Sequence, residues 1–258
     1  EALYQQVSGE GLYSGILDRV LSLKQQLRKS QIGLTERLVE LDFFIRRQSS
    51  LSDRLYAEVV NSRMRPFSDA AEPFPRLVRD LAKQLRKKVK FIVEGKNTSV
   101  DREILEKLEA PLNHLLRNAV DHGIESRAER IASGKNEVGT ISLNAFHKAG
   151  MLLIKVSDDG RGVDLENLRK KIVEKGFVST TIAEKLSESE LLEFLFLPGF
   201  STSKEVTDVS GRGIGLNVVQ NMVQEVGGSI KAYLEDGFVV ELQLPLTISV
   251  IRALMVEI

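Results

Sequence analysis

The stretch Asn113–Gly123, with the sequence NHLLRNAVDHG, carries the most distinctive chemical pattern in the chain. On a helix, one face would carry four polar side chains: His114 and, four, seven and eight residues after it, Asn118, Asp121 and His122. The other side is apolar and is expected to pack against a core, with Leu108, Leu112, Leu115 and Ala119. The polar face suits a metal–phosphate site, because an amide oxygen can bind a hard cation and a neutral imidazole accepts a proton near pH 7. A solvated polar face is the alternative.

Composition narrows the class of protein. The chain has 258 residues, 42% of them hydrophobic and 28% charged, which is the profile of a soluble globular protein with one large domain or two smaller ones. Lys plus Arg and Asp plus Glu both number 36, so no excess charge indicates a nucleic-acid or membrane partner. The absence of cysteine excludes disulfides and thiolate metal sites. No apolar run approaches 18 residues, and we expect a cytoplasmic protein.

The N-terminal part has a helical stripe of apolar residues. Its spacing is four, four, three and four over Leu12, Ile16, Val20, Leu23 and Leu27. Gly33 interrupts the stripe, Thr35 can cap a restart, and apolar residues then continue to Val59. We therefore predict an antiparallel hairpin of two helices over residues 1–65. Its wide apolar stripe needs a partner, for which a second copy completing a four-helix bundle is favoured over the chain's own downstream domain.

From residue 66 onward the chain alternates helices and strands. Predicted strands cover Val89–Glu94, Thr140–Phe146, Met151–Val156, Ser229–Leu234 and Val239–Leu244. Predicted helices cover Phe74–Arg86, Asp101 through the Asn113 stretch, Leu165–Lys175, Glu188–Phe196 and Ile214–Val226. Antiparallel hairpins with helices on one face give an α+β fold, a two-layer sandwich.

Two glycine-rich segments indicate ligand contacts. The first, DDGRG at Asp158–Gly162, follows a predicted strand, so its carboxylate can accept a hydrogen bond from the exocyclic amine of adenine while the glycines admit a flat ring. An ordinary Asp-Gly turn is the competing interpretation. The second, GRGIGL at Gly211–Leu216, opens a helix and offers backbone N–H groups to phosphate. The segment before it, Pro198–Ser210, lacks apolar periodicity and is predicted to be a lid.

Four segments together resemble a known family. HLLRNAVDHGIE, DDGRGVD, LFLPGFSTSK and SGRGIGLNVV are similar, in order and spacing, to the catalytic part of the CheA-type histidine kinases of the gyrase, Hsp90, histidine kinase and MutL (GHKL) superfamily. The resemblance covers Arg63 to Pro245 closely. It implies a dimerisation hairpin at 1–65, a Bergerat-type ATP-binding kinase domain at 66–246 and the start of a CheW-like regulatory domain at 247–258, so the chain is expected to be a fragment.

The resemblance also implies roles, cofactors and partners. His114, Arg117 and His122 would be catalytic, Asn118 would bind Mg²⁺, and Asp158 would bind the adenine of ATP in a pocket shaped by Gly160 and Gly162. Further nucleotide contacts would come from Asp121, Phe200, Ser201, Thr202, Ser203, Lys204, Gly211, Gly213, Ile214, Gly215 and Leu216. Ser203 stands where the family commonly has a basic residue, with Lys204 next. Implied partners are a second copy, a histidine phosphotransfer domain, a response regulator, a CheW-like coupling protein and a chemoreceptor-type sensor.

The acceptor of the phosphoryl group is expected outside this chain. Of the three histidines, His114 and His122 lie on the predicted nucleotide face, and His147 stands at a strand end beside a turn. Two other readings remain open: an ATPase of the same superfamily, which a glutamate at position 114 would have favoured, and a catalytically idle dimeric scaffold.

Overall fold

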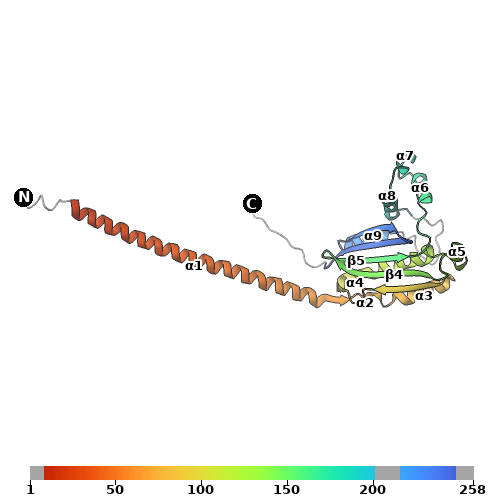
Figure 1. The fold of residues 1–258 in the computed structure, drawn as a ribbon, viewed down its shortest axis with the longest axis horizontal. Coiled ribbons are helices and arrows are strands. Elements are labelled where there is room, and N and C mark those ends of the chain that lie inside the picture. The colour runs from red at the N-terminus through yellow and green to blue at the C-terminus, as the bar shows by residue number, and fades with distance from the viewer. Residues whose placement is uncertain (1–8, 201–215, 248–258) are drawn as a thin grey trace, which may run out of the picture. The chain divides into compact units, whose positions relative to one another are not determined.

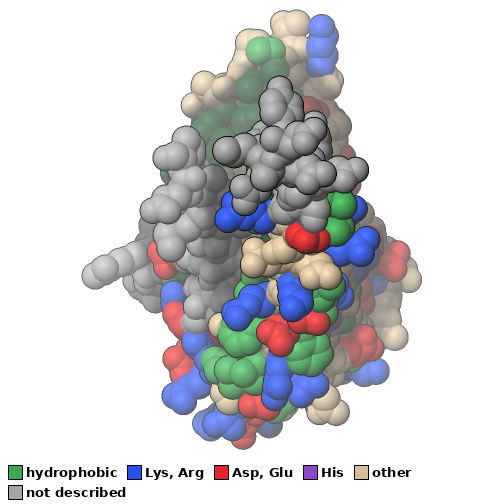
Figure 2. Space-filling model, turned by 90° about the vertical axis from the view of Figure 1, so that its left-hand side faces the viewer, with side chains coloured by type: hydrophobic (Ala, Val, Ile, Leu, Met, Phe, Trp, Pro, Cys, Tyr) green, Lys and Arg blue, Asp and Glu red, His purple; other side chains and the backbone are tan. Residues whose placement is uncertain are grey.

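This computed structural model describes residues 9–200 and 216–247, with side chains from residue 17 onward. The chain divides into two compact units, residues 1–62 and 63–258 (Figure 1). Within the described ranges, no helix combines the length and the apolar run that crossing a bilayer requires. On the face viewed in Figure 2, basic and acidic side chains are interspersed, in keeping with their equal numbers in the sequence.

Helix α1 (Gly9–Arg63) forms the first unit. Its helical character agrees with the sequence, but the expected break is not present in this structure, because the helix runs on through Gly33 for 55 residues in all. A glycine destabilises a helix by only about 1 kcal/mol, which the helix formers around it offset. Thr35 does not cap a second helix, since its hydroxyl donates to the carbonyl of Gln31 one turn earlier at 2.9 Å. The hairpin remains a prediction for an assembly with a second copy.

The second unit is organised around a five-stranded sheet with the order β2-β4-β5-β7-β6. Its strands are β2 (Val89–Glu94), β4 (Gly139–Lys148), β5 (Met151–Asp158), β6 (Ser229–Leu234) and β7 (Phe238–Pro245). All five were predicted, and β2 and β6 have the predicted bounds. The sheet is mixed, because β2 runs parallel to β4 whereas the other neighbours are antiparallel. A parallel pair requires a long crossover, which the segment between β2 and β4 supplies.

Helices cover the sheet and complete the two-layer sandwich. The longer ones are α3 (Phe74–Gln84), α4 (Arg102–Asn118), α6 (Leu165–Glu174) and α9 (Leu216–Glu225). Shorter ones are α2 (Ser68–Ala71), α5 (Arg127–Ala132), α7 (Thr180–Ala183), α8 (Glu188–Glu193), the π-helical turn η2 (Ala119–Gly123) and the 3₁₀ turn η3 (Phe194–Phe196). Buried residues of α3, α4 and α9 share one core with the sheet. The predicted α+β sandwich is confirmed.

Two further features complete the second unit. Strands β1 (Met64–Pro66) and β3 (Ser99–Asp101) form a separate antiparallel ribbon that leads into α4. Helices α6, α7 and α8 lie together, apart from α2 and α3 (Figure 1), and α6 and α8 share a second apolar cluster with Phe200. This second cluster brings the described start of the predicted lid segment against the sandwich.

Candidate functional site

Helix α4 carries the first group of candidate residues. It begins at a capped end, where the Asp101 carboxylate accepts a hydrogen bond from the backbone N–H of Glu103 at 2.8 Å. The predicted apolar side is buried at Leu108, Leu112, Leu115 and Ala119. Because this side is fixed in the core, the opposite side places His114 and Asn118 at the half-buried edge of the helix.

The regular helix does not continue through the whole stretch. After Asn118 the backbone becomes the π-helical turn η2, in which the N–H of Ile124 donates to the carbonyl of Ala119 at 2.9 Å. Asp121 and His122 therefore do not follow the α-helical spacing assumed from the sequence, and His122 is exposed whereas Asp121 is half-buried. Lys87 holds this turn, since its ammonium donates to the carbonyls of Val120 and Asp121 at 2.9 and 2.5 Å. Such π-turns occur frequently at functional sites.

His114 has an unusual environment. Its Nε2 atom is buried and has no hydrogen-bond partner within the described part of the chain. Burial, followed by the positive charge of Arg117 and the proximity of His122, lowers the pKa of the His114 imidazole below its ordinary value. The ring is therefore mainly neutral at pH 7.

Asp158 lies at the end of β5 and is almost completely buried. Burial is the main cause that raises its pKa to about 6, against the opposing effect of hydrogen bonds from the backbone of Gly160 and Phe238. The Gly160 N–H donates to Asp158 Oδ1 at 3.0 Å. A buried carboxylate at a strand end is a strong acceptor for an exocyclic amine.

The two sequence motifs meet at their glycines. A Cβ placed on Gly160 would lie 2.1 Å from the carbonyl oxygen of Gly123, and one on Gly123 would lie 2.8 Å from the Asp158 carboxylate. The backbone N–H of Arg161 also donates to the Gly123 carbonyl at 3.0 Å. The end of η2 and the loop after β5 are thus in direct backbone contact, which any side chain at either glycine would prevent.

The remaining candidates fall into two groups. Gly162 has a positive φ of 66°, a conformation that favours glycine, and its added Cβ would contact Leu234 at 3.4 Å. Phe200 is buried against Phe177, with ring centroids 5.7 Å apart, and Leu216 begins α9 half-buried. The other predicted lid residues lie outside the described residues: Ser201, Thr202, Ser203, Lys204, Gly211, Gly213, Ile214 and Gly215.

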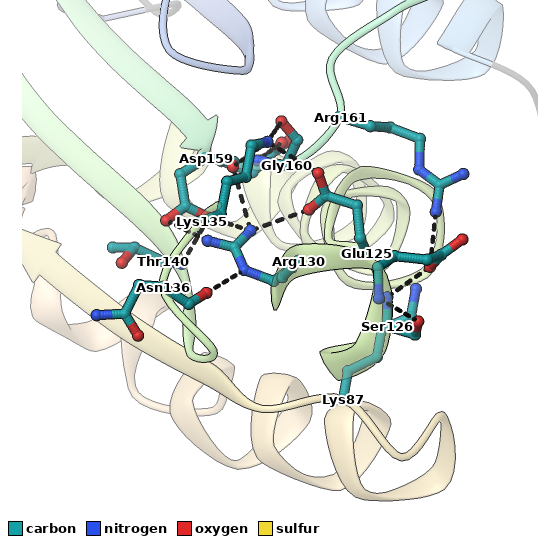
Figure 3. Close-up of polar contacts among 12 residues, drawn as sticks. Lys87, Glu125, Ser126, Arg130, Lys135, Asn136, Thr140, Asp159, Gly160 and Arg161 are labelled. Atoms are coloured by element: carbon teal, nitrogen blue, oxygen red, sulfur yellow. Dashed lines mark hydrogen bonds and ion pairs between the residues drawn. The ribbon is translucent and has the colours of Figure 1, made fainter. Parts of the chain in front are cut away.

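Sequence reasoning missed several residues that support the site. Glu125, Arg130, Lys135 and Asp159 form a charged cluster behind the Asp158 loop (Figure 3), and Lys87 holds η2. A partial signal existed for the helix that carries Arg130, because Ser126 and Glu129 form a capping box that predicts a short helix. The burial of Arg130 had no local signal, since it depends on partners distant in the sequence.

The residues present fit a nucleotide and a divalent cation. The described residues contain no group of three or more His, Asp or Glu side chains arranged to hold a metal ion. Asn118, at the end of α4, could supply one neutral oxygen ligand beside phosphate oxygens. The His114 Nε2, which has no partner among the described residues, and the Asp158 carboxylate are the polar groups that the two ends of such a ligand would meet.

Comparisons with known proteins agree with this arrangement. Residues 107–248 match the family described as Histidine kinase-, DNA gyrase B-, and HSP90-like ATPase. The chemotaxis protein CheA of Bacillus subtilis is 36% identical over 248 residues, covering 93% of this chain and 37% of that protein. The sensor histidine kinase CheAY of Helicobacter pylori is 40% identical over 221 residues, covering 85% and 28%. The CheA of Halobacterium salinarum is 39% identical over 246 residues, covering 94% and 36%.

The chain therefore spans only 28–37% of the length of these relatives. Among solved structures, the histidine kinase domain of the Erythrobacter litoralis EL346 blue-light activated histidine kinase aligns with a TM-score of 0.41 at 17% identity, over 71% of this chain and 63% of that one. The family match covers more than half of this chain and includes both motifs that meet at Gly123 and Asp158. The chain belongs to the histidine kinase-, DNA gyrase B- and HSP90-like ATPase family, in which it is similar to the CheA-type histidine kinases.

Proposed function

We propose that this chain is the kinase core of a cytoplasmic signalling protein and transfers the γ-phosphoryl group of ATP to a histidine on a separate phosphotransfer domain. The observation that carries this proposal is the continuity of α4 and η2. His114, whose buried Nε2 has no partner among the described residues, lies in the second half of α4, and the last residue of η2, Gly123, contacts the Asp158 carboxylate. A single rigid element thus supports both the phosphate end and the base end of the ligand.

Asp158 would select the base. Its carboxylate would accept a hydrogen bond from the exocyclic amine of adenine, whereas the corresponding carbonyl of guanine would present a second acceptor. Gly160 lets the loop lie against Gly123, and Gly162 would leave room for the ring. These residues would therefore make the pocket selective for adenine.

The groups on and after α4 would bind the phosphates. Asn118 would ligate Mg²⁺ through its side-chain oxygen, and Arg117, Asp121 and His122 would lie near the triphosphate. The Mg²⁺ held there would supply positive charge that offsets the negative charge developing on the phosphate oxygens. Phe200 and Leu216, together with Ser201–Lys204 and Gly211–Gly215, would close over the nucleotide.

His114 would take part in the transfer step. A nitrogen of the acceptor imidazole attacks the γ-phosphorus, the bond to the bridging oxygen breaks, and ADP leaves. The neutral His114 ring would orient the acceptor and accept its N–H proton, for which the lowered pKa keeps the ring unprotonated at pH 7. We expect none of the chain's three histidines to be the acceptor. His114 is fixed in α4, His122 would lie beside the triphosphate, and His147 Nε2 donates to the backbone carbonyl of Ser99 at 2.9 Å.

The first unit would hold two copies together. Every large apolar side chain described along α1, from Leu17 to Val59, is exposed in the single chain. A four-helix bundle with a second copy would require α1 to fold back into the predicted hairpin, and it would remove a large apolar area from water. Light scattering should show a dimer for the whole chain and a monomer for a chain starting at Pro66, and a monomer in both cases would contradict the bundle. Further partners would be a response regulator, a CheW-like coupling protein and a chemoreceptor-type sensor.

Label transfer tests the proposal. The chain is mixed with Mg²⁺, γ-labelled ATP and a separate histidine-bearing phosphotransfer domain, and both proteins are separated and counted. Acid-labile, alkali-stable label is expected on the phosphotransfer domain and not on this chain. Release of labelled phosphate without transfer would indicate an ATPase instead, and neither transfer nor hydrolysis would indicate an idle scaffold.

A further inference from the structure

A buried charged cluster lies directly behind the loop that carries Asp158 (Figure 3). Arg130 is only 2% exposed and Glu125 only 6%. Arg130 Nη1 donates to one carboxylate oxygen of Glu125 at 2.9 Å, and Lys135 Nζ donates to the other at 2.8 Å. With Asp159, the cluster has two positive and two negative groups, so the buried charges are balanced.

The cations of the cluster donate hydrogen bonds to two backbone carbonyls of the loop. Lys135 Nζ donates to the carbonyls of Asp159 and Gly160 at 3.1 and 2.7 Å, so that with Glu125 all three of its N–H groups are used. Arg130 Nη1 donates to the same Asp159 carbonyl at 3.2 Å, and its Nη2 donates to the Asp159 carboxylate at 3.1 Å. Asp159 is also fixed to β4 by the backbone N–H of Thr140 at 2.9 Å.

These carbonyls belong to the peptide groups whose N–H groups donate to Asp158 and to Gly123. The peptide between Asp159 and Gly160 accepts from the two cations at its oxygen and donates from Gly160 N to Asp158 Oδ1 at 3.0 Å. The next peptide accepts from Lys135 at the Gly160 oxygen and donates from Arg161 N to the Gly123 carbonyl at 3.0 Å. Because a peptide group is planar, holding its oxygen also fixes the direction of its N–H.

The contact leaves little room for a different arrangement. Gly160 and Gly123 are already so close that an added Cβ would lie 2.1 Å from the Gly123 oxygen, so the loop cannot move inward. The Glu125 carboxylate stays ionised at neutral pH. Burial raises the pKa of Glu125, but hydrogen bonds from Lys135 and Arg130 outweigh this effect and hold the pKa below its ordinary value.

We propose that Lys135 and Arg130, bridged by Glu125, are positioning residues that hold the Asp158–Gly160 loop in the orientation in which Asp158 recognises the base. They would act through two peptide groups and not by touching the nucleotide. The inference rests on the proposed binding of adenine by Asp158, and it assigns the selectivity of that site partly to side chains outside it. Buried ion pairs contribute little net stability as a rule, which makes a role in specifying geometry the better account of this one.

The test uses the whole chain with Lys135→Met, compared with Lys88→Met. Lys135 is one third exposed, so its replacement by an apolar side chain of similar length leaves no cavity in the core. Lys88 is a matched control, since its side chain pairs at the surface with Glu137 alone and is 55% exposed. Calorimetry with ATP and with GTP, both with Mg²⁺, gives the two affinities and their ratio, and thermal unfolding without nucleotide reports stability.

Lys135→Met is expected to weaken ATP binding about tenfold, the equivalent of ~1.4 kcal/mol, and to reduce the ATP-to-GTP ratio, while Lys88→Met leaves both unchanged. Lys135→Arg, which keeps a charged donor, should recover part of the ratio. A purely structural role would lower the melting temperature without changing the ratio. If Lys135→Met does not fold, Lys135→Gln takes its place with the same expectation.

The outcomes separate the two proposals. A wild-type chain that binds ATP and GTP equally would overturn the proposed role of Asp158 itself. A wild-type chain that prefers ATP, with a Lys135 variant that folds and keeps the same preference, would overturn the positioning role alone.

Discussion

The two ends of the candidate site differ in whether their polar groups have hydrogen-bond partners within the chain. Around Asp158, the Gly160 N–H, the Gly123 carbonyl and the carbonyls held by Lys135 all have partners within the chain. At the other end, the buried Nε2 of His114 has none among the described residues. The proposed base end is therefore organised in the free protein, whereas the proposed phosphate end has a polar group that a ligand or acceptor would complete.

This difference predicts where substitutions act. Changes at the phosphate end should alter transfer more than binding, because the groups there are engaged only when phosphate and acceptor are present. Changes at the base end should alter binding and selectivity, because the loop is formed in the free protein.

The largest effect is expected for His114→Gln. Glutamine has a similar reach but no titratable nitrogen, so ATP binding should persist while transfer to the phosphotransfer domain drops roughly 10²–10⁴-fold, as is typical for loss of a general base. Single-turnover label transfer measures the rate, and calorimetry measures binding. Equal loss of binding and transfer would mean that His114 contributes to ATP binding and not specifically to the transfer step.

The second largest effect on transfer is expected for Asn118→Asp. The added negative charge would lie beside the triphosphate, where two charges about 4 Å apart repel by roughly 4 kcal/mol at an effective dielectric constant near 20. Transfer should fall at least about 100-fold, with the far-ultraviolet circular dichroism of the protein unchanged. Unaltered transfer rates in this variant would remove Asn118 from the metal and phosphate site.

Asp158→Asn should change selectivity by a smaller factor. In the native chain, guanine would place a carbonyl against the carboxylate and leave two acceptors unpaired, a difference of about 1–3 kcal/mol in favour of ATP. Asparagine offers both a donor and an acceptor and should bring the two affinities closer together. Competitive binding of ATP and GTP to both proteins measures the ratio, and a ratio near one in the native chain would contradict the assignment.

The smallest expected effect is a pH dependence of ATP binding. The pKa of Asp158 is raised to about 6, so the ionised acceptor form predominates above that pH and is lost below it. ATP affinity should therefore fall by about tenfold between pH 7 and pH 5 from this group. Asp158→Asn serves as the control, because the part of the pH dependence due to Asp158 should vanish while contributions from phosphate and histidine remain. The same slope in both proteins would assign it to those other groups.

The fold of the sandwich was largely predictable because its signals are local. Alternation of apolar and polar side chains defines β2 and β6 with the bounds predicted from sequence, since it depends only on residues two apart. The parallel pairing of β2 with β4 was not predictable in this way. It depends on where the chain returns to the sheet 45 residues further on, in a register that pairs Val89 with Gly139.

Two helical features show the same limit. Gly33 suggested a break in the N-terminal segment, but the structure has one helix there, because a single glycine lowers helix stability only slightly. Asp121 and His122 were placed on a regular helix, but η2 changes their spacing, and the ammonium of Lys87, 34 residues before Asp121, holds that turn.

The sequence by itself determined the order of the elements, the apolar side of α4 and the identity of the residues nominated for the site, because these follow from spacing along the chain and from side-chain chemistry. Only the tertiary structure decided that Gly123 and Gly160 touch, that Nε2 of His114 is buried, and that Arg130 is an interior charge. The physical reason is that burial and hydrogen bonding depend on partners far away in the sequence. Arg130 is stable in the interior because Asp159, 29 residues later, and Glu125 both pair with it.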